Sequence, residues 1–192
     1  MDNAPADFVK NASEEELRKL TVCVHRTFNG EDLIAYVRAL RSLFRRYGSL
    51  GEFFEGRYAA TGSIPSVLSD FRREFFAEPH PPRSEKHLSS IDKGSACKRL
   101  NMFLRWMIRR DSAVDFGIWR RMSPADLIIP LDTHVCRVAF LLELTDKPSF
   151  SLSAARCITE ALAEVFPGDP CLGDFALFGY GVNHPELTDN LP

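Results

Sequence analysis

Apolar residues recur at spacings of three and four through most of this 192-residue chain, which places them along one face of an α-helix. Only Thr21–Phe28 and Leu127–Pro130 have the composition of strands, and both are too short to found a sheet. The sequence therefore predicts an all-α fold. The clearest helices are predicted over residues 29–47, 63–75, 96–107, 135–142, 152–165 and 169–181.

Local signals mark where several of these helices begin and end. Ser13 and Glu16 have the spacing of a capping box at the start of a short helix. Asn29 and Asp32 open a longer helix, and Gly48 is placed to end it. These signals agree with the apolar spacing, so the helix boundaries and the helix faces support one interpretation.

A proline-rich loop at residues 79–82 divides the helical pattern into two parts. Each proline there restricts the backbone of the residue before it, so the loop cannot be helical. We therefore expect a two-lobed helical bundle. The first lobe would comprise residues 1–82, and the second, residues 83–192, would carry the residues suited to chemistry.

The composition excludes several classes of protein. Apolar residues at 45% and charged residues at 26% are typical of globular chains rather than disordered ones. No apolar stretch approaches the roughly 20 residues needed to cross a bilayer, and the first residues lack the basic region of a secretion signal. The five cysteines include no Cys-x-x-Cys pair, which favours free thiols in a reducing compartment. We expect a cytoplasmic protein without a membrane partner, a metal ion or a cofactor.

Basic charge is concentrated in one segment. The whole chain has a formal charge of -2, whereas residues 93–121 carry a net charge of +6. A local basic face on an acidic protein favours an anionic polymer as its partner. The alternative is a solvated helix face with extended arginines. The basic residues are Lys93, Lys98, Arg99, Arg105, Arg109, Arg110, Arg120 and Arg121.

The start of this basic segment has features of a phosphate-binding site. Gly94 and Ser95 lead into a helix, so backbone N–H groups are available to an anion, with Lys93 and Arg99 close by in the sequence. Lys98 lies in the first helical turn, where the helix dipole and Arg99 favour its neutral, nucleophilic amine. A polar first turn with a solvated lysine is the alternative interpretation.

Asp132 is the second candidate for chemistry. It follows the apolar run Leu127–Leu131 and begins the next apolar helix. Peptide dipoles at a helix start keep a carboxylate ionised at neutral pH, and an ionised carboxylate can stabilise a developing cation. An aspartate that only caps the helix produces the same pattern, so this alternative stays open.

The run PLDTHVCRV at residues 130–138 resembles the catalytic-aspartate segment of the helix-hairpin-helix DNA glycosylases, the superfamily of endonuclease III. In this resemblance Asp132 falls on the catalytic aspartate, and Thr133, His134 and Arg137 fall on the neighbours that open its helix. The runs KGSACKRLNMFLRWMIRRD, IIPLDTHVCRV and GDFALFGYGV also resemble a bacterial protein family of unknown function that is placed near this superfamily. The second resemblance covers essentially the whole chain.

A hairpin-borne lysine precedes the aspartate in the superfamily, and Lys98 is the candidate for it. The usual hairpin reads Leu-Pro-Gly-x-Gly-x-Lys, whereas Lys98 follows Gly94 by four residues. The 34 positions from Lys98 to Asp132 resemble the archaeal 8-oxoguanine glycosylase branch. The cysteines that bind the iron–sulfur cluster of endonuclease III are missing, so the resemblance implies no such cofactor. Members of the unknown-function family have a further helical stretch ahead of the position of Met1, which leads us to expect an incomplete first lobe.

The resemblance implies a partner, double-stranded damaged DNA, and a set of residues that face it. Because the bond to be cut is unreachable in the base stack, the target nucleotide would be flipped out of the duplex, with Trp106 in the base pocket. We expect Lys98 and Asp132 to converge at the mouth of one cleft between the lobes. At least one of Arg105 and Arg109 should face the same side. The expected DNA-binding residues are Lys93, Gly94, Ser95, Arg99 and Arg105.

Three functions remain open at this stage. The first is a base-excision glycosylase/lyase for a damaged base such as 8-oxoguanine, with Lys98 as nucleophile and Asp132 as stabilising carboxylate. The second is a DNA-binding protein with the same fold and no turnover, and the third is a helical interaction protein unrelated to nucleic acid. Salt-dependent duplex binding separates the first two from the third, and covalent trapping separates the first from the second.

Overall fold

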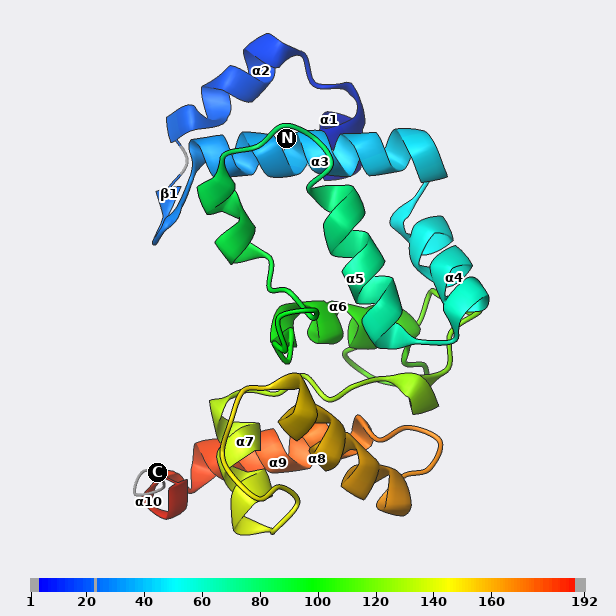
Figure 1. The fold of residues 1–192 in the computed structure, drawn as a ribbon, viewed down its shortest axis with the longest axis vertical. Coiled ribbons are helices and arrows are strands. Elements are labelled where there is room, and N and C mark those ends of the chain that lie inside the picture. The colour runs from blue at the N-terminus through cyan, green and yellow to red at the C-terminus, as the bar shows by residue number, and fades with distance from the viewer. Residues whose placement is uncertain (1–3, 23, 189–192) are drawn as a thin grey trace. The chain divides into compact units, whose positions relative to one another are not determined.

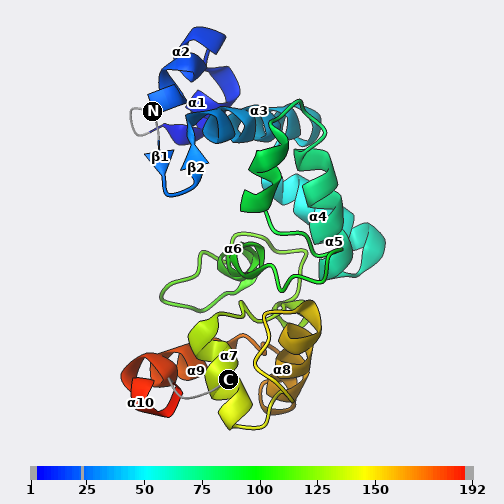
Figure 2. The same ribbon diagram turned by 60° about the vertical axis from the view of Figure 1, so that its left-hand side comes forward.

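The computed structural model describes residues 4–22 and 24–188, and this part of the chain is mostly helical, as expected for an all-α protein. The strands described in it are Val24–His25 (β1) and Phe28–Asn29 (β2), which pair antiparallel in a short hairpin (Figure 2). Leu127–Pro130 is an extended loop segment. None of the described helices combines the length and the apolar character needed to cross a membrane.

The chain divides into two compact units. The boundary predicted after residue 82 lies a few residues before the end of the first unit, at Ser89. The first unit comprises the chain up to residue 61 together with residues 66–89, and the second comprises residues 62–65 and the chain from residue 90 onward. The helices of the first unit are α1 (Pro5–Asn11), α2 (Glu14–Arg18), η1 (Lys19–Val22), α3 (Gly30–Tyr47), α4 (Leu50–Thr61), most of α5 (Ile64–Phe75) and η2 (Pro82–His87).

The long helix α3 organises the amino-terminal part of the first unit, where α1 and α2 lie beside it (Figure 1). Its start is the predicted capping box, in which the Asn29 side chain accepts from the Asp32 N–H and the Asp32 side chain accepts from the Asn29 N–H. The chain leaves α3 at Gly48 with φ +78°, a conformation that favours glycine. Leu17 and Val37 are buried between these helices.

The second unit holds every candidate for chemistry. Its core includes Leu104, Ile129 and Ile158, which are fully buried. Within it α7 and α9 pack closely at Gly181. A Cβ added at Gly181 would lie only 2.9 Å from the Cβ of His134, so a larger residue there would force the helices to shift. The helices are α6 (Lys98–Ile108), η3 (Pro124–Asp126), α7 (Thr133–Leu141), α8 (Leu152–Val165), α9 (Leu172–Asn183) and α10 (Pro185–Thr188).

Candidate functional site

The loop before α6 is fixed to the segment that precedes α8. The N–H of Leu152 donates to the carbonyl of Gly94 at 2.8 Å, and a neighbouring isolated bridge pairs Ser95 with Ser151. Gly94 at φ +77° turns the chain in the left-handed region, and the residue before α6 also has a positive φ. This loop places Lys98 as the first residue of α6.

Backbone N–H groups of the loop donate within the chain, which limits the predicted phosphate site. Because these donors are occupied, Gly94 and Ser95 do not offer their N–H groups to an anion. No side chain caps the first turn of α6, and Lys93 and Arg99 are exposed beside it. The internal bonds run from Gly94 to Ile91, from Ser95 to Ser90, from Ala96 to Phe150 and from Cys97 to the Ser95 hydroxyl.

Asp132 is held at the start of α7 by the chain on both sides of it. The preceding run is anchored by Leu131, which is buried, and by the N–H of Ile129, which donates to the Thr159 hydroxyl at 3.1 Å. Asp132 itself caps α7, because its Oδ1 accepts from the Val135 N–H at 2.9 Å. Asp132 is therefore a helix cap, and this role fixes one of its two carboxylate oxygens.

The second oxygen of Asp132 meets Lys98. The Lys98 Nζ donates to Oδ2 at 3.2 Å, although the two residues are 34 positions apart in the chain. The expected convergence of the two side chains is confirmed, whereas their place in a cleft between lobes stays a prediction. The Lys98 side chain is 46% exposed and that of Asp132 is 12% exposed, so solvent reaches the pair. The arrangement joins an amine to a positioned carboxylate at an accessible surface.

The two other arginines proposed for the DNA face are buried. Arg105 is 5% exposed and Arg109 is 3% exposed, so neither lies on the surface. This corrects the expectation that Arg105 binds DNA and that one of the two faces the partner. The physical reason is that acidic residues distant in sequence form ion pairs with both guanidinium groups.

These ion pairs form one continuous cluster. Arg105 Nη1 donates to Asp174, and Arg105 Nε lies 3.4 Å from Asp115. Arg109 donates to Asp115 at 2.6 Å and to Asp169 at 2.7 Å. We call these five residues the buried arginine cluster. Sequence reasoning missed its acidic members, although Asp174 carried a signal as a single charge in an apolar helix.

Burial changes the acidity of this cluster. It raises the pKa of Asp174 to about 6, with Arg105 opposing the shift and repulsion from Asp132 adding to it. The Cys171 thiol has its pKa raised above its ordinary range, again chiefly because it is buried. Asp174 therefore has a pKa closer to neutral pH than an ordinary aspartate has.

Trp106, the predicted base-pocket residue, is 40% exposed on α6. Its carbonyl accepts from the N–H groups of Phe116 and Gly117, which anchors the loop that follows the helix. Trp119 is buried instead and packs edge-on against Phe103 at 5.4 Å between ring centroids. An exposed indole is accessible to a partner, and the base-pocket role stays a prediction.

The family described as "Protein of unknown function (DUF2400)" matches residues 1–183. The chain belongs to this family. The match agrees with the expected family of unknown function, and the further relationship to the DNA glycosylases stays a proposal. No curated protein and no solved structure matches the chain.

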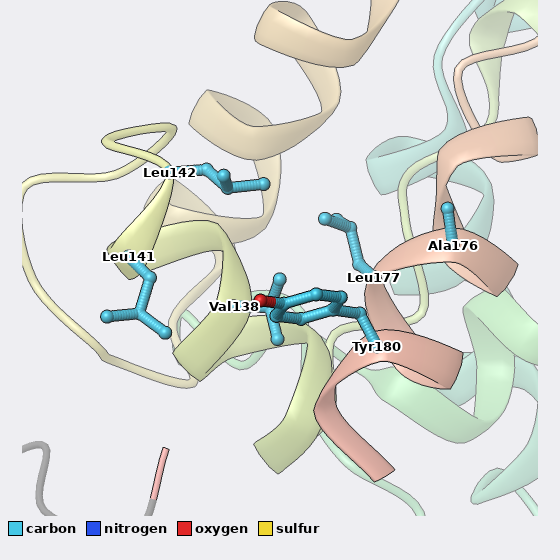
Figure 3. A pocket seen from close by; sticks show the side chains of 6 residues that line it. All are labelled: Val138, Leu141, Leu142, Ala176, Leu177 and Tyr180. Carbon is cyan, nitrogen blue, oxygen red and sulfur yellow. The ribbon is translucent and has the colours of Figure 1, made fainter. Parts of the chain in front are cut away.

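An apolar hollow lies between α7 and α9, and neither Lys98 nor Asp132 is among its lining residues. It has a volume of about 470 Å³, and its lining is apolar except for the Tyr180 hydroxyl (Figure 3). No group of three His, Cys, Asp or Glu side chains within residues 4–22 and 24–188 is placed to hold a metal ion. The hollow is lined by Val138, Leu141, Leu142, Ala176, Leu177 and Tyr180.

Proposed function

We propose that this protein is a DNA base-excision glycosylase/lyase with Lys98 as nucleophile and Asp132 as stabilising carboxylate. The observation that carries the proposal is the 3.2 Å contact between Lys98 Nζ and Asp132 Oδ2. A nucleophile and a stabilising carboxylate must reach the same sugar, so they must lie within a few ångströms of each other. The resemblance of residues 130–138 to a catalytic-aspartate segment points to Asp132 as one member of this pair.

Asp132 has the geometry for stabilising a cation. One of its oxygens is fixed by the N–H of Val135, which holds the carboxylate in a single orientation at the helix start. As the base leaves, positive charge develops on the sugar, and a fixed negative charge beside it lowers the barrier. Because the carboxylate is held in place by the fold, little reorganisation is needed during the reaction.

Lys98 would perform the covalent step after losing a proton. Only the neutral amine can attack, so a proton must leave the Lys98 ammonium first, and solvent reaches the pair to accept it. The amine then bonds to the sugar C1′ while the glycosidic bond breaks. The departing base keeps the bonding electrons and takes up a proton. Opening of the sugar ring leaves an imine between Lys98 and the sugar.

The DNA partner would contact the exposed charges next to the first turn of α6. Lys93 and Arg99 are exposed there, and the uncapped N-terminus of the helix adds partial positive charge. Phosphate contacts of this kind position a duplex without reading its sequence. Damaged double-stranded DNA, with 8-oxoguanine as the first lesion to test, is therefore the proposed substrate.

Borohydride trapping tests the chemistry and the substrate together. The protein is incubated with duplexes that contain 8-oxoguanine, thymine glycol, uracil or an abasic site, and the imine is reduced to a stable adduct. We expect an adduct with the abasic site and with at least one damaged base. Absence of an adduct on every duplex, under conditions in which the protein binds DNA, would contradict the lyase proposal.

A helical interaction protein is the second candidate, and the apolar hollow between α7 and α9 favours it. Leu142 and Tyr180 at this hollow are about half exposed, and such exposure is typical of surfaces that bind another protein. Duplex binding at several salt concentrations discriminates the two functions. Phosphate contacts release counterions, so the DNA proposal predicts a steep loss of affinity with salt, whereas the second candidate predicts no duplex binding at low salt.

A further inference from the structure

The loop that follows α6 exposes a row of apolar side chains. Between residues 114 and 119 the side chains alternate, since Val114, Phe116 and Ile118 are exposed, whereas the Asp115 carboxylate and Trp119 are buried. Such alternation is typical of an extended backbone that packs one face on the protein. We call the three exposed residues the apolar stripe. Its middle residue, Phe116, is 68% exposed.

Hydrogen bonds and an ion pair hold this loop in place. The N–H groups of Phe116 and Gly117 both donate to the Trp106 carbonyl, at 2.7 and 3.1 Å. The Asp115 carboxylate accepts from Arg109 at 2.6 Å on the inner side of the loop. Gly117 has φ +56°, and a Cβ there would lie 2.6 Å from the Arg109 carbonyl oxygen, so a side chain would force the loop away. The exposure of the stripe is therefore built into the fold.

The exposed face of α6 places an indole between cations. Arg99 and Trp106 are seven positions apart, so they lie on the same face of the helix, about 10 Å from each other along its axis. Arg110 follows just beyond the end of α6, and its Nη2 donates to the Arg120 carbonyl at 2.9 Å. Exposed guanidinium groups thus flank both Trp106 and the loop that carries the stripe.

The positive charge of this surface is not neutralised by the carboxylates near it. In the part of the chain that the structure describes, Arg99, Arg110 and Arg120 form no ion pair. The carboxylates of the buried arginine cluster pair with Arg105 and Arg109 instead. Across residues 99–126 the exposed charged residues are four arginines and two aspartates, which leaves a net charge of +2.

A surface of exposed aromatic and apolar side chains between arginines fits single-stranded nucleic acid. Unpaired bases have flat apolar faces that stack on aromatic rings, and each nucleotide also brings a phosphate for a guanidinium group. A paired duplex keeps these faces inside its own stack. An anionic membrane would satisfy the charges, but it has no flat faces for the two exposed rings, Trp106 and Phe116, on a fixed loop and helix.

We propose that Trp106 and the apolar stripe bind single-stranded nucleic acid. Unpaired bases stack on Trp106 and Phe116, and the flanking arginines hold the phosphates. The binding goes beyond the excision chemistry, because it requires no damaged base and no reaction at Lys98.

Fluorescence anisotropy with a labelled oligothymidine of about 15 nucleotides tests the proposal, at a length within the usual range of single-strand sites. The wild type should bind at low salt and lose affinity steeply as the salt concentration rises. Phe116→Ala should weaken binding roughly tenfold, the order expected for one lost stacking contact. Phe150→Ala is the matched control, because it removes another exposed phenylalanine ring, on the loop before α8, and should leave the affinity unchanged.

Two further variants separate stacking from charge. Bases stacked on an indole quench its emission, so the oligonucleotide should quench the wild type. Trp106→Phe should keep most of the affinity and lose most of the quenching, since the remaining Trp119 is buried. Replacing Arg110 and Arg120 together by Gln should reduce the slope of log affinity against log salt by roughly 1.4, because each phosphate contact on a single strand contributes about 0.7.

The proposal is overturned if the wild type does not bind the single strand at low salt, if Phe116→Ala and Phe150→Ala bind alike, or if binding leaves the indole emission unchanged. Vesicles of phosphatidylserine and phosphatidylcholine test the other partner: vesicle binding that depends on Phe116, without oligonucleotide binding, would assign the surface to a membrane. Single-strand binding without a borohydride adduct on any duplex would leave this proposal standing and the glycosylase proposal wrong; an adduct without single-strand binding has the opposite meaning.

Discussion

The two groups of ion pairs on α6 show how burial decides what a basic residue does. Lys98 at the start of the helix forms one contact with Asp132 and stays 46% exposed, whereas Arg109 just beyond its end makes two ion pairs and is 3% exposed. Exposed pairs contribute roughly 0–1 kcal/mol to stability, but a buried charge that loses its partner costs several kcal/mol. The exposed pair is therefore suited to chemistry and the buried cluster to holding the fold.

The largest expected effect comes from breaking the buried cluster. Arg109→Ala leaves the buried Asp115 carboxylate and the half-buried Asp169 carboxylate without the Arg109 guanidinium, so it should lower the free energy of unfolding by about 3–5 kcal/mol. Arg110→Ala is the control, because this neighbour is exposed and its loss should cost less than about 0.5 kcal/mol. Urea unfolding monitored by circular dichroism measures both. If both variants lowered the free energy of unfolding equally, burial would not determine how much these arginines contribute to stability.

The next effect concerns the exposed pair. Asp132→Asn keeps the size of the side chain and an oxygen for the Val135 N–H, but it removes the negative charge. Single-turnover release of the base that the wild type accepts should fall on the order of 100-fold or more, while stability changes by no more than about 1 kcal/mol. If this variant keeps full activity, Asp132 is only a helix cap.

Asp174 should make stability depend on pH. Its folded pKa is raised to about 6 from 3.8, so the folded state binds the proton more tightly, and the stability gained from that proton is lost as pH rises through 6. Asp174→Asn removes this loss. The wild type should therefore lose about 1.4 kcal/mol relative to the variant between pH 5 and pH 8. Urea unfolding at both pH values checks the sign; a variant with the same pH dependence as the wild type would show that Asp174 does not titrate there.

The smallest expected effect lies at the surface. Reversing Lys93 and Arg99 to Glu should weaken duplex binding roughly tenfold at low salt, by a similar factor for all sequences, and should reduce the salt dependence. Fluorescence anisotropy with two unrelated duplexes measures both quantities. Lys147→Glu, on another loop, serves as the control. Unchanged affinity in the double variant would show that this surface does not contact DNA.

Most of the helices followed from the spacing of apolar residues, but α4 did not. Its buried Phe53 and Phe54 are adjacent, and Gly51 and Gly56 interrupt the segment, so no stripe with a spacing of three and four is visible. Tertiary packing of the two aromatic rings outweighs this weak local pattern. By contrast, the capping box at Asn29 combined two local signals and placed the start of α3 correctly.

The candidate site was predictable only in part, for a similar reason. Lys98 and Asp132 each lie at the start of a helix, which local patterns indicate, and their contact confirms that they converge. Two of the acidic partners of the buried arginines are distant in sequence, since Arg105 and Asp174 are 69 positions apart and Arg109 and Asp169 are 60 positions apart. A count of charged residues along the sequence does not distinguish an arginine on the surface from one that forms ion pairs in the core. The count for residues 93–121 therefore overestimates the positive charge that this segment exposes to a partner.

The account depends most directly on which lysine forms the covalent adduct. Wild type and Lys98→Gln are incubated with an abasic-site duplex and borohydride, and the modified peptide is located by mass spectrometry. The account predicts one adduct at Lys98 in the wild type and none in Lys98→Gln, with the variant folded and still bound to the duplex. An adduct at another lysine, or one that persists in Lys98→Gln, would contradict the assignment of Lys98 as nucleophile.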